Sequence, residues 1–219
     1  MQLSQFIPGP DLGALLARAP VVPVLAIESI ETALPLARAL VDGGLSVLEI
    51  TLRTPAALQV IEAIAGEIGG AVVGAGTVLT PNDYQSAARA GARFIVSPGA
   101  TPALHDAAAA SPVPFLPGAA TASDVMALLE RGYRSLKFFP AEPVGGVAYL
   151  KALAGPLPEA RFCPTGGIDA ERAREYLALP NVLCVGGSWV APRDAVAARD
   201  WPRITGLARA AAALRRPAT

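Results

Sequence analysis

Residues 71–97, with the sequence AVVGAGTVLTPNDYQSAARAGARFIVS, contain a complete strand–helix–strand unit. The run 71–78 is mostly apolar, and Thr80 then places a capping hydroxyl directly before a proline, which is typical of a helix start. Gly91 supplies the left-handed residue that ends many helices, and the apolar run 93–97 follows at once. Continuous apolar strands joined through a helix indicate parallel strands that are buried on both faces.

The same unit recurs along the chain and predicts the fold class. The candidate strands are residues 21–27, 47–51, 71–78, 93–97, 114–117, 135–139, 161–165 and 182–185, and the capping residues before the helices are Thr54, Thr80, Thr101, Thr121 and Asp169. Eight such units predict a single (β/α)8 TIM barrel over residues 1–219, with an extra N-terminal helix, residues 2–18, packed on it. A doubly wound open sheet is the alternative, but residues 26–28 lack the glycine-rich first turn of that fold.

The balance of residue types excludes several classes of protein. The hydrophobic fraction of 53% and the charged fraction of 16% predict a large core, because a disordered chain has the opposite balance. The formal net charge is zero, and the basic pair 215–216 is too short for a nucleic-acid-binding surface. Residues 1–13 lack a secretory signal, and glycine, proline or a charge interrupts each apolar run before it could span a membrane. We therefore expect a cytoplasmic protein that does not bind membranes.

Two charged side chains, Lys137 and Glu49, fall inside apolar strands. Only two of the eighteen basic residues are lysines, so a lysine between Leu136 and Phe138 needs an explanation. One explanation is structural: the lysine stem covers apolar surface, or the two charges form a buried ion pair. The other is chemical, because a desolvated lysine can become a neutral amine nucleophile and a carboxylate beside it can move protons. In a barrel, both side chains would reach the same interior.

Other features at the strand ends indicate an anionic substrate. Arg53 directly follows a strand, where its planar fork could bind a carboxylate, although it could also be an ordinary surface arginine. Two glycine pairs end the last two strands, and barrels often bind phosphate in the loops after strands seven and eight. These residues, with the serine that follows, are Gly166, Gly167, Gly186, Gly187 and Ser188.

A metal site is not expected from the sequence. His105 is the single histidine, and its segment places it on the surface of a helix. Cys163 and Cys184 lie in separate apolar strands, where they are interpreted as small buried hydrophobes. The lack of histidine also disfavours a Ser–His–Asp or Cys–His site. Lysine is thus the well-placed nucleophile, and no metal or cofactor is predicted.

Seven segments in order resemble the 2-keto-3-deoxy-6-phosphogluconate (KDPG) and 4-hydroxy-2-oxoglutarate (KHG) aldolase family, whose members are class I aldolases. The segments are VLEITLR (47–53), VGAGTV (73–78), FIVSPG (94–99), FLPG (115–118), LKFFPAE (136–142), FCPTGGI (162–168) and VGGSW (185–189). The resemblance implies a Schiff-base lysine at Lys137 and a proton-transfer carboxylate at Glu49. It also implies a phosphorylated keto-acid substrate and a homotrimer.

The resemblance assigns the remaining site residues as well. It implies that Arg53 and Thr77 hold the pyruvyl carboxylate, that Pro98 and Phe139 line the pocket, and that Thr165 lies by the substrate hydroxyls. The glycine pairs and Ser188 would take the phosphate. Three alternatives stay open: an aldolase for the galactonate epimer, a barrel isomerase or decarboxylase, and a sugar-phosphate binder without catalysis. The isomerase or decarboxylase would use the same phosphate loops but has no need for an imine, and the binder gives no reason for Glu49 and Lys137 to meet in an apolar interior.

Overall fold

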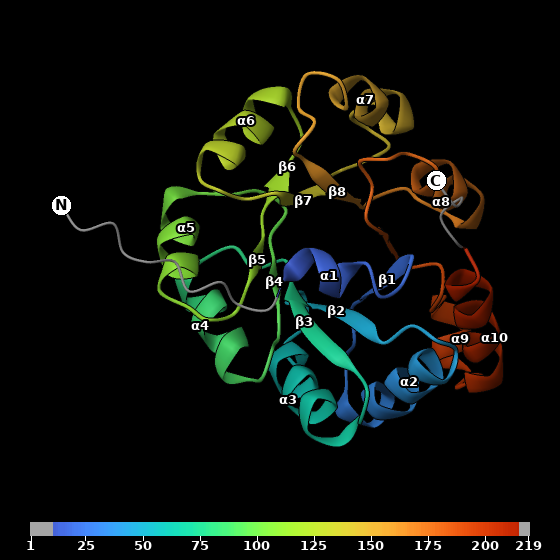
Figure 1. Ribbon diagram of the computed structural model, residues 1–219. Helices are drawn as coiled ribbons and strands as arrows, with labels where there is room; N and C mark the ends of the chain where they lie inside the picture. The colour runs from blue at the N-terminus through green and yellow to red at the C-terminus, as the bar shows by residue number, and fades with distance from the viewer. Residues whose placement is uncertain (1–10, 215–219) are drawn as a thin grey trace.

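The computed structural model describes residues 11–214, and Figure 1 shows them as a ring of helices around a curled sheet. The strands are β1 (Val21–Leu25), β2 (Val47–Thr51), β3 (Val72–Gly76), β4 (Ile95–Val96), β5 (Phe115–Leu116), β6 (Gly118–Ala119), β7 (Ser135–Phe138), β8 (Arg161–Pro164) and β9 (Val185–Gly187). The helices are α1 (Leu12–Leu16), α2 (Ile30–Asp42), α3 (Ala57–Glu67), α4 (Pro81–Arg89), α5 (Pro102–Ala109), α6 (Ala122–Glu130), α7 (Gly146–Leu153), α8 (Ala170–Leu177), α9 (Arg193–Ala197) and α10 (Trp201–Ala212).

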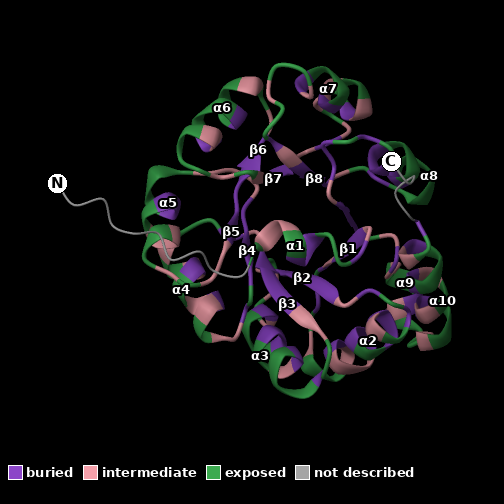
Figure 2. Cartoon of the chain, viewed as in Figure 1, coloured by how far each residue is buried: buried purple, intermediate pink, exposed green. Residues whose placement is uncertain are grey.

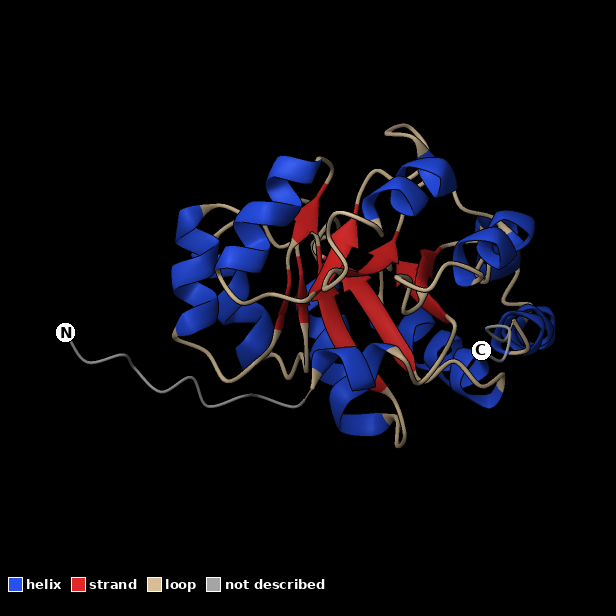
Figure 3. Cartoon of the chain, turned by 45° about the horizontal axis from the view of Figure 1, so that its top comes forward, coloured by secondary structure: helices blue, strands red, loops and turns tan. Residues whose placement is uncertain are grey.

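Every pairing between the described strands is parallel. One sheet has the order β5-β4-β3-β2-β1-β9 and the other the order β6-β7-β8. A single residue, Pro117, separates β5 from β6, and isolated parallel bridges join Phe162 to Val182 and Thr165 to Gly186, beside β8 and β9. The order β1 to β5 follows the chain without the reversal of a doubly wound sheet. The architecture is an α/β fold with a curled parallel sheet, and Figure 3 shows its strands surrounded by helices.

Successive residues along each strand point in turn to the inside of the curl and to the surrounding helices, because the side chains of a strand alternate between its two faces. The outward set packs against the helices, whose far sides are exposed in Figure 2. The inward set forms a separate apolar cluster with two leucines of α1: Leu15, Leu16, Val22, Val47, Phe94, Val96, Leu116, Cys163 and Cys184. Helix α1 therefore fills the interior from the side at which the strands begin, and the opposite, carboxyl side is left for polar groups.

Side-chain capping decides where most of the helices begin. The predicted caps that form are Thr80, Thr101, Thr121 and Asp169. Thr80 makes a full capping box, in which the Asp83 side chain accepts from the Thr80 backbone. The prediction for Thr54 was wrong, because α3 begins at Ala57 and the Thr54 hydroxyl instead donates to the Ile27 carbonyl at 2.7 Å. Thr54 thus joins the loop after β2 to the loop after β1.

The first and last predicted elements agree with the structure only in part. Asp11 caps α1 and accepts from the Gly13 N–H at 3.0 Å, whereas residues 2–10 of the predicted helix lie outside the described residues. The last strand was placed wrongly at 182–185. Val182 makes only an isolated bridge, and the ladder with β1 begins at Val185 and runs into the glycine pair. The strand extends into glycines, which have low strand propensity on their own, so the apolar run does not mark its position.

Candidate active site

Lys137 and Glu49 meet inside the curled sheet. Lys137 lies on β7 and Glu49 on β2, 88 positions apart in the chain, and Lys137 Nζ donates to Glu49 Oε1 at 3.1 Å. Their side chains are 6% and 3% exposed. The predicted meeting of the two charges in an apolar interior is therefore confirmed. A proton can pass along this hydrogen bond, so the pair can present a neutral amine beside a protonated carboxyl.

Gly76, at the end of β3, makes room for the carboxylate. A Cβ added at Gly76 would collide with Glu49 Oε1, the same atom that accepts from Lys137. Thr51 and Gly76 are register partners on β2 and β3, so the glycine lies beside the strand that carries Glu49. Gly76 was not among the predicted site residues. Its role depends on the register between two strands, which the sequence pattern does not contain.

The floor of the site is apolar. Cys163 is the register partner of Lys137 on β8, and both it and Cys184 are buried in the interior cluster. The hydrogen bond with Cys163 and burial raise the pKa of the Cys184 thiol, with a smaller contribution from the charge of Glu49. The Cys184 thiol therefore stays protonated and brings no charge below the pair. The burial of both cysteines agrees with their prediction as small buried hydrophobes. The Lys137–Glu49 hydrogen bond lies in surroundings of low polarity, which strengthen it.

The predicted carboxylate-binding residues follow the carboxyl ends of β2 and β3. Arg53 Nε donates to Thr51 Oγ1 at 3.1 Å, and the Thr51 hydroxyl donates to the Leu25 carbonyl at 2.9 Å. These two hydrogen bonds hold the Nε end of the Arg53 guanidinium, and the residue is otherwise exposed. Thr77 is half-buried and has a φ of +58°, which is uncommon for a residue that is not glycine. Such strain is often found at functional sites.

Of the two predicted pocket-lining residues, Phe139 lies next to the lysine and Pro98 lies against the neighbouring strand β6. Phe139 directly follows β7, and Lys137 Nζ lies 5.5 Å from the centre of its ring. Pro98 is half-buried after β4, and its backbone touches β6 so closely that a Cβ on Gly118 would collide with it. Gly118 is in turn the register partner of Lys137. The structure thus brings Phe139 next to the lysine and places Pro98 one strand away.

The two glycine pairs lie side by side at the ends of β8 and β9. Thr165 forms the bridge to Gly186, and a Cβ on Gly186 would collide with the Thr165 hydroxyl. Gly166 and Gly167 have φ values of +107° and +79°, so both need the left-handed conformation that glycine adopts freely. Ser188 follows β9 and is exposed. Backbone amides in such glycine-rich turns can form a cradle for an anion.

The sequence profile described as "Aldolase: KDPG and KHG aldolase" matches residues 12–207 of the chain. The chain belongs to the KDPG and KHG aldolase family. This match covers every candidate site residue named above. The members of this family compared below are aldolases, which are lyases.

Individual members of the family are similar over nearly the whole chain. The "KHG/KDPG aldolase" of Escherichia coli K12 is 51% identical over 198 residues, which are 90% of this chain and 93% of that protein. The solved KDPG aldolase of Legionella pneumophila, with pyruvate captured as a covalent carbinolamine, is 47% identical with a TM-score of 0.89 and covers 92% and 98% of the two chains. The Zymomonas mobilis enzyme solved with 3-phosphoglycerate is 50% identical with a TM-score of 0.90, over 95% and 98%.

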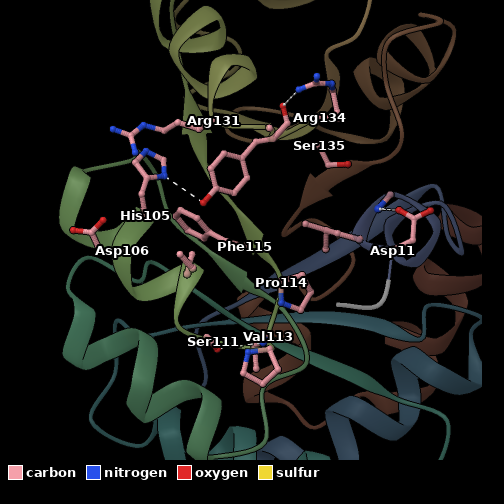
Figure 4. Close-up of a pocket in the computed structure, with 17 residues that line it drawn as sticks. Asp11, His105, Asp106, Ser111, Val113, Pro114, Phe115, Arg131, Arg134 and Ser135 are labelled. Carbon is pink, nitrogen blue, oxygen red and sulfur yellow. Dashed lines mark hydrogen bonds between the residues drawn. The ribbon is translucent and has the colours of Figure 1, made fainter. Parts of the chain in front are cut away.

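A cavity of about 560 Å³ lies apart from the candidate site, and none of the candidate site residues named above lines it (Figure 4). His105 lines this cavity and is buried, so the prediction that it lies on a helix surface was wrong. Nδ1 of His105 lies 3.3 Å from the Tyr133 hydroxyl, and both rings pack edge-on against Phe115. Burial, and then the charge of Arg131, lower the pKa of His105, which favours the neutral ring. The pattern of apolar neighbours in α5 was too weak to reveal this burial.

Two further observations bear on the predicted classes. Within residues 11–214, no group of three or more His, Cys, Asp or Glu side chains is arranged to hold a metal ion. No helix in that range combines the length and apolar character needed to cross a membrane.

Proposed function

We propose that the protein is a class I aldolase that cleaves KDPG to pyruvate and glyceraldehyde 3-phosphate, and that it also cleaves 4-hydroxy-2-oxoglutarate to pyruvate and glyoxylate. The observation that carries the proposal is the buried hydrogen bond between Lys137 Nζ and Glu49 Oε1 at 3.1 Å. A buried ion pair seldom stabilises a fold more than apolar residues would, so a chemical role explains it better. The names of the relatives at about half identity support the two substrates.

The first stage would be imine formation. Glu49 takes a proton from the Lys137 ammonium, and the neutral amine attacks the C2 ketone of the substrate. The proton left on nitrogen moves to the C2 oxygen, giving a carbinolamine. Glu49 then returns its proton to that hydroxyl, which leaves as water, and a protonated imine joins C2 to Lys137. Glu49 is again a carboxylate at the end of this stage.

The second stage would be carbon–carbon cleavage. Glu49 takes the proton of the C4 hydroxyl, directly or through a water, and the C3–C4 bond breaks. Its electrons pass into the imine to give an enamine, while C4 becomes the aldehyde of glyceraldehyde 3-phosphate. Glu49 returns the proton to C3, and water hydrolyses the imine to pyruvate and the Lys137 ammonium. Each atom and each proton is then accounted for.

The other site residues would bind the two ends of the substrate. Arg53, whose base is held by Thr51, would grip the C1 carboxylate with Thr77. Phe139 and Pro98 would line the pyruvyl pocket, and Thr165 would contact the hydroxyls. The backbone of the loops after β8 and β9 would hold the phosphate, with the residues Gly166, Gly167, Gly186, Gly187 and Ser188.

We propose in addition that the curled sheet closes into a single-domain (β/α)8 barrel. The one-residue break between β5 and β6 and the bridges from β8 to the β9 segment support closure on both sides. Family resemblance supports a cytoplasmic homotrimer. Analytical ultracentrifugation tests the assembly, and a monomer at micromolar concentration would contradict the trimer.

Pyruvate release from KDPG, its galactonate epimer and 4-hydroxy-2-oxoglutarate tests the function. We expect cleavage of KDPG, and none by Lys137→Arg, which keeps the charge but cannot form the imine. Faster cleavage of the galactonate epimer would change the assigned substrate and leave the lysine in place. Substantial turnover by Lys137→Arg, or no pyruvate from any of the three with folded parent protein, would refute the proposal.

A further inference from the structure

A polar cluster outside the Lys137–Glu49 pair holds the loop after β8 in place. Glu142, in the loop after β7, receives a hydrogen bond from the Tyr176 hydroxyl at 2.5 Å on one carboxylate oxygen, and its other oxygen lies 3.4 Å from Arg172 Nε. Both partners belong to α8. Arg172 Nη1 also donates to the Gly167 carbonyl at 3.1 Å. The cluster thus joins the loop after β7, helix α8 and one of the glycine pairs.

The same carboxylate side chain presses directly on Gly167. A Cβ added at Gly167 would lie 2.8 Å from Glu142 Cγ, and the Glu142 N–H donates to the Gly166 carbonyl at 3.1 Å. Because a trans peptide is planar, fixing the Gly167 carbonyl on Arg172 turns the next N–H, that of Ile168, to the opposite side. The orientation of a backbone donor in this loop is therefore set by side chains from two other elements.

Tyr176 is a rigid anchor for the cluster. Its residue is fully buried, and burial, followed by the hydrogen bond with Glu142, raises the pKa of its hydroxyl, so the hydroxyl stays a donor. Arg172, in contrast, is half-exposed on the surface of α8. Glu142 thus links the fixed position of a core residue to the guanidinium that also donates to the Gly167 carbonyl.

We propose that Glu142 is a positioning residue for the phosphate of the substrate, acting through Arg172 and the Gly166–Gly167 backbone. This inference rests on the proposed function, which places the phosphate in this loop. The two possible roles of Glu142, as a negative charge and as a positioning group, predict opposite effects on phosphate binding. By charge alone, removing a carboxylate near a phosphate site would improve phosphate binding. If Glu142 holds the loop and Arg172 in place, its neutralisation weakens binding instead.

The test compares phosphorylated and non-phosphorylated substrates in Glu142→Gln. We expect KM for KDPG to rise about tenfold, as for the loss of one charge-assisted hydrogen bond, with kcat little changed. Cleavage of 4-hydroxy-2-oxoglutarate and solvent exchange of the pyruvate methyl protons, which involve no phosphate, should stay within about twofold of the parent. Glu171→Gln is the matched control, because it removes an exposed carboxylate from the first turn of α8 outside the cluster.

Tyr176→Phe removes the anchor hydroxyl and should move KM for KDPG in the same direction by a smaller factor. If Glu142→Gln does not fold, KM for KDPG in Tyr176→Phe tests the positioning role instead. An unchanged or lowered KM for KDPG in the folded variants, or an equal loss with both kinds of substrate, overturns the proposal. Failure of the parent protein to exchange the pyruvate methyl protons would instead count against the proposed function, so the two failures are distinguishable.

Discussion

Gly76→Ala separates catalytic geometry from stability in this protein. The added methyl would occupy the place of Glu49 Oε1, the oxygen that accepts from Lys137 Nζ at 3.1 Å. Gly76 has no left-handed φ, so its backbone tolerates alanine, and the nearest atoms to the added methyl are Cγ, Cδ and Oε1 of Glu49. The far end of a glutamate moves more easily than a strand. We therefore expect the carboxylate to shift, and the strand to stay.

The expected losses of kcat and of stability follow from this displacement of the Glu49 side chain. A shift of about 1 Å in a reacting group costs about 100-fold in rate, so kcat should fall by about two orders of magnitude. Overpacking of an interior costs about 1–3 kcal/mol, which is the loss of stability expected here. In a chain of this length that corresponds to a decrease in Tm of about 2–4 °C per kcal/mol. Activity should thus fall far more than stability.

The assay is steady-state cleavage of KDPG together with thermal unfolding of the same preparation. Gly66→Ala is the matched control, because Gly66 lies in α3 and an added Cβ there has no neighbour within 4 Å. In a helix interior that change should stabilise by up to about 1 kcal/mol and leave kcat unaltered. A Gly76→Ala protein with the kcat of the parent would refute the claim that Gly76 sets the position of the catalytic carboxylate.

Three other variants test separate parts of the account. Glu49→Gln can still accept from Lys137 but cannot take a proton, so kcat should fall by about 100-fold to 10,000-fold, and a loss under about tenfold would point to another base. Burial lowers the pKa of His105 below 6.5, so the stability it contributes is complete above pH 6.5 and is lost as pH falls through the lowered value. His105→Phe should therefore lose less unfolding free energy than the parent between about pH 7 and about pH 5 in urea titrations, and an equal loss would contradict this. Thr80→Ala removes the capping box of α4 and should lower the free energy of unfolding by about 1 kcal/mol with kcat unchanged, whereas no change would show the cap to be dispensable.

The parts of the fold that follow from local rules were predictable from the sequence. Thr80, Thr101 and Thr121 begin helices because a hydroxyl that accepts a backbone N–H acts over three residues. Thr54 has the same local pattern, yet its hydroxyl is taken by a carbonyl 27 positions away. The end of the curled sheet was missed for a related reason. Strand β9 pairs through glycines that have little strand preference and depend on their neighbours, β1 and Thr165.

The candidate site also contains residues that the local sequence reveals and residues that depend on contacts between distant elements. Glu49 and Lys137 could be singled out because a charge inside an apolar strand is conspicuous, and parallel strands bring their carboxyl ends to one face. Gly76 and Glu142 could not, since the first depends on strand register and the second on the packing of α8 against a loop. His105 was placed wrongly because its burial depends on Tyr133 and Phe115, which come from other elements.

The most direct test of the central claim is to incubate the protein with pyruvate and sodium borohydride and to measure its intact mass, followed by peptide mapping. The account predicts one reduced pyruvyl adduct, on the peptide that holds buried Lys137 and not on the one that holds exposed Lys151. Lys137→Arg should give no adduct. An adduct on Lys151 alone, or none on the folded parent protein, would contradict the assignment of Lys137 as the Schiff-base nucleophile.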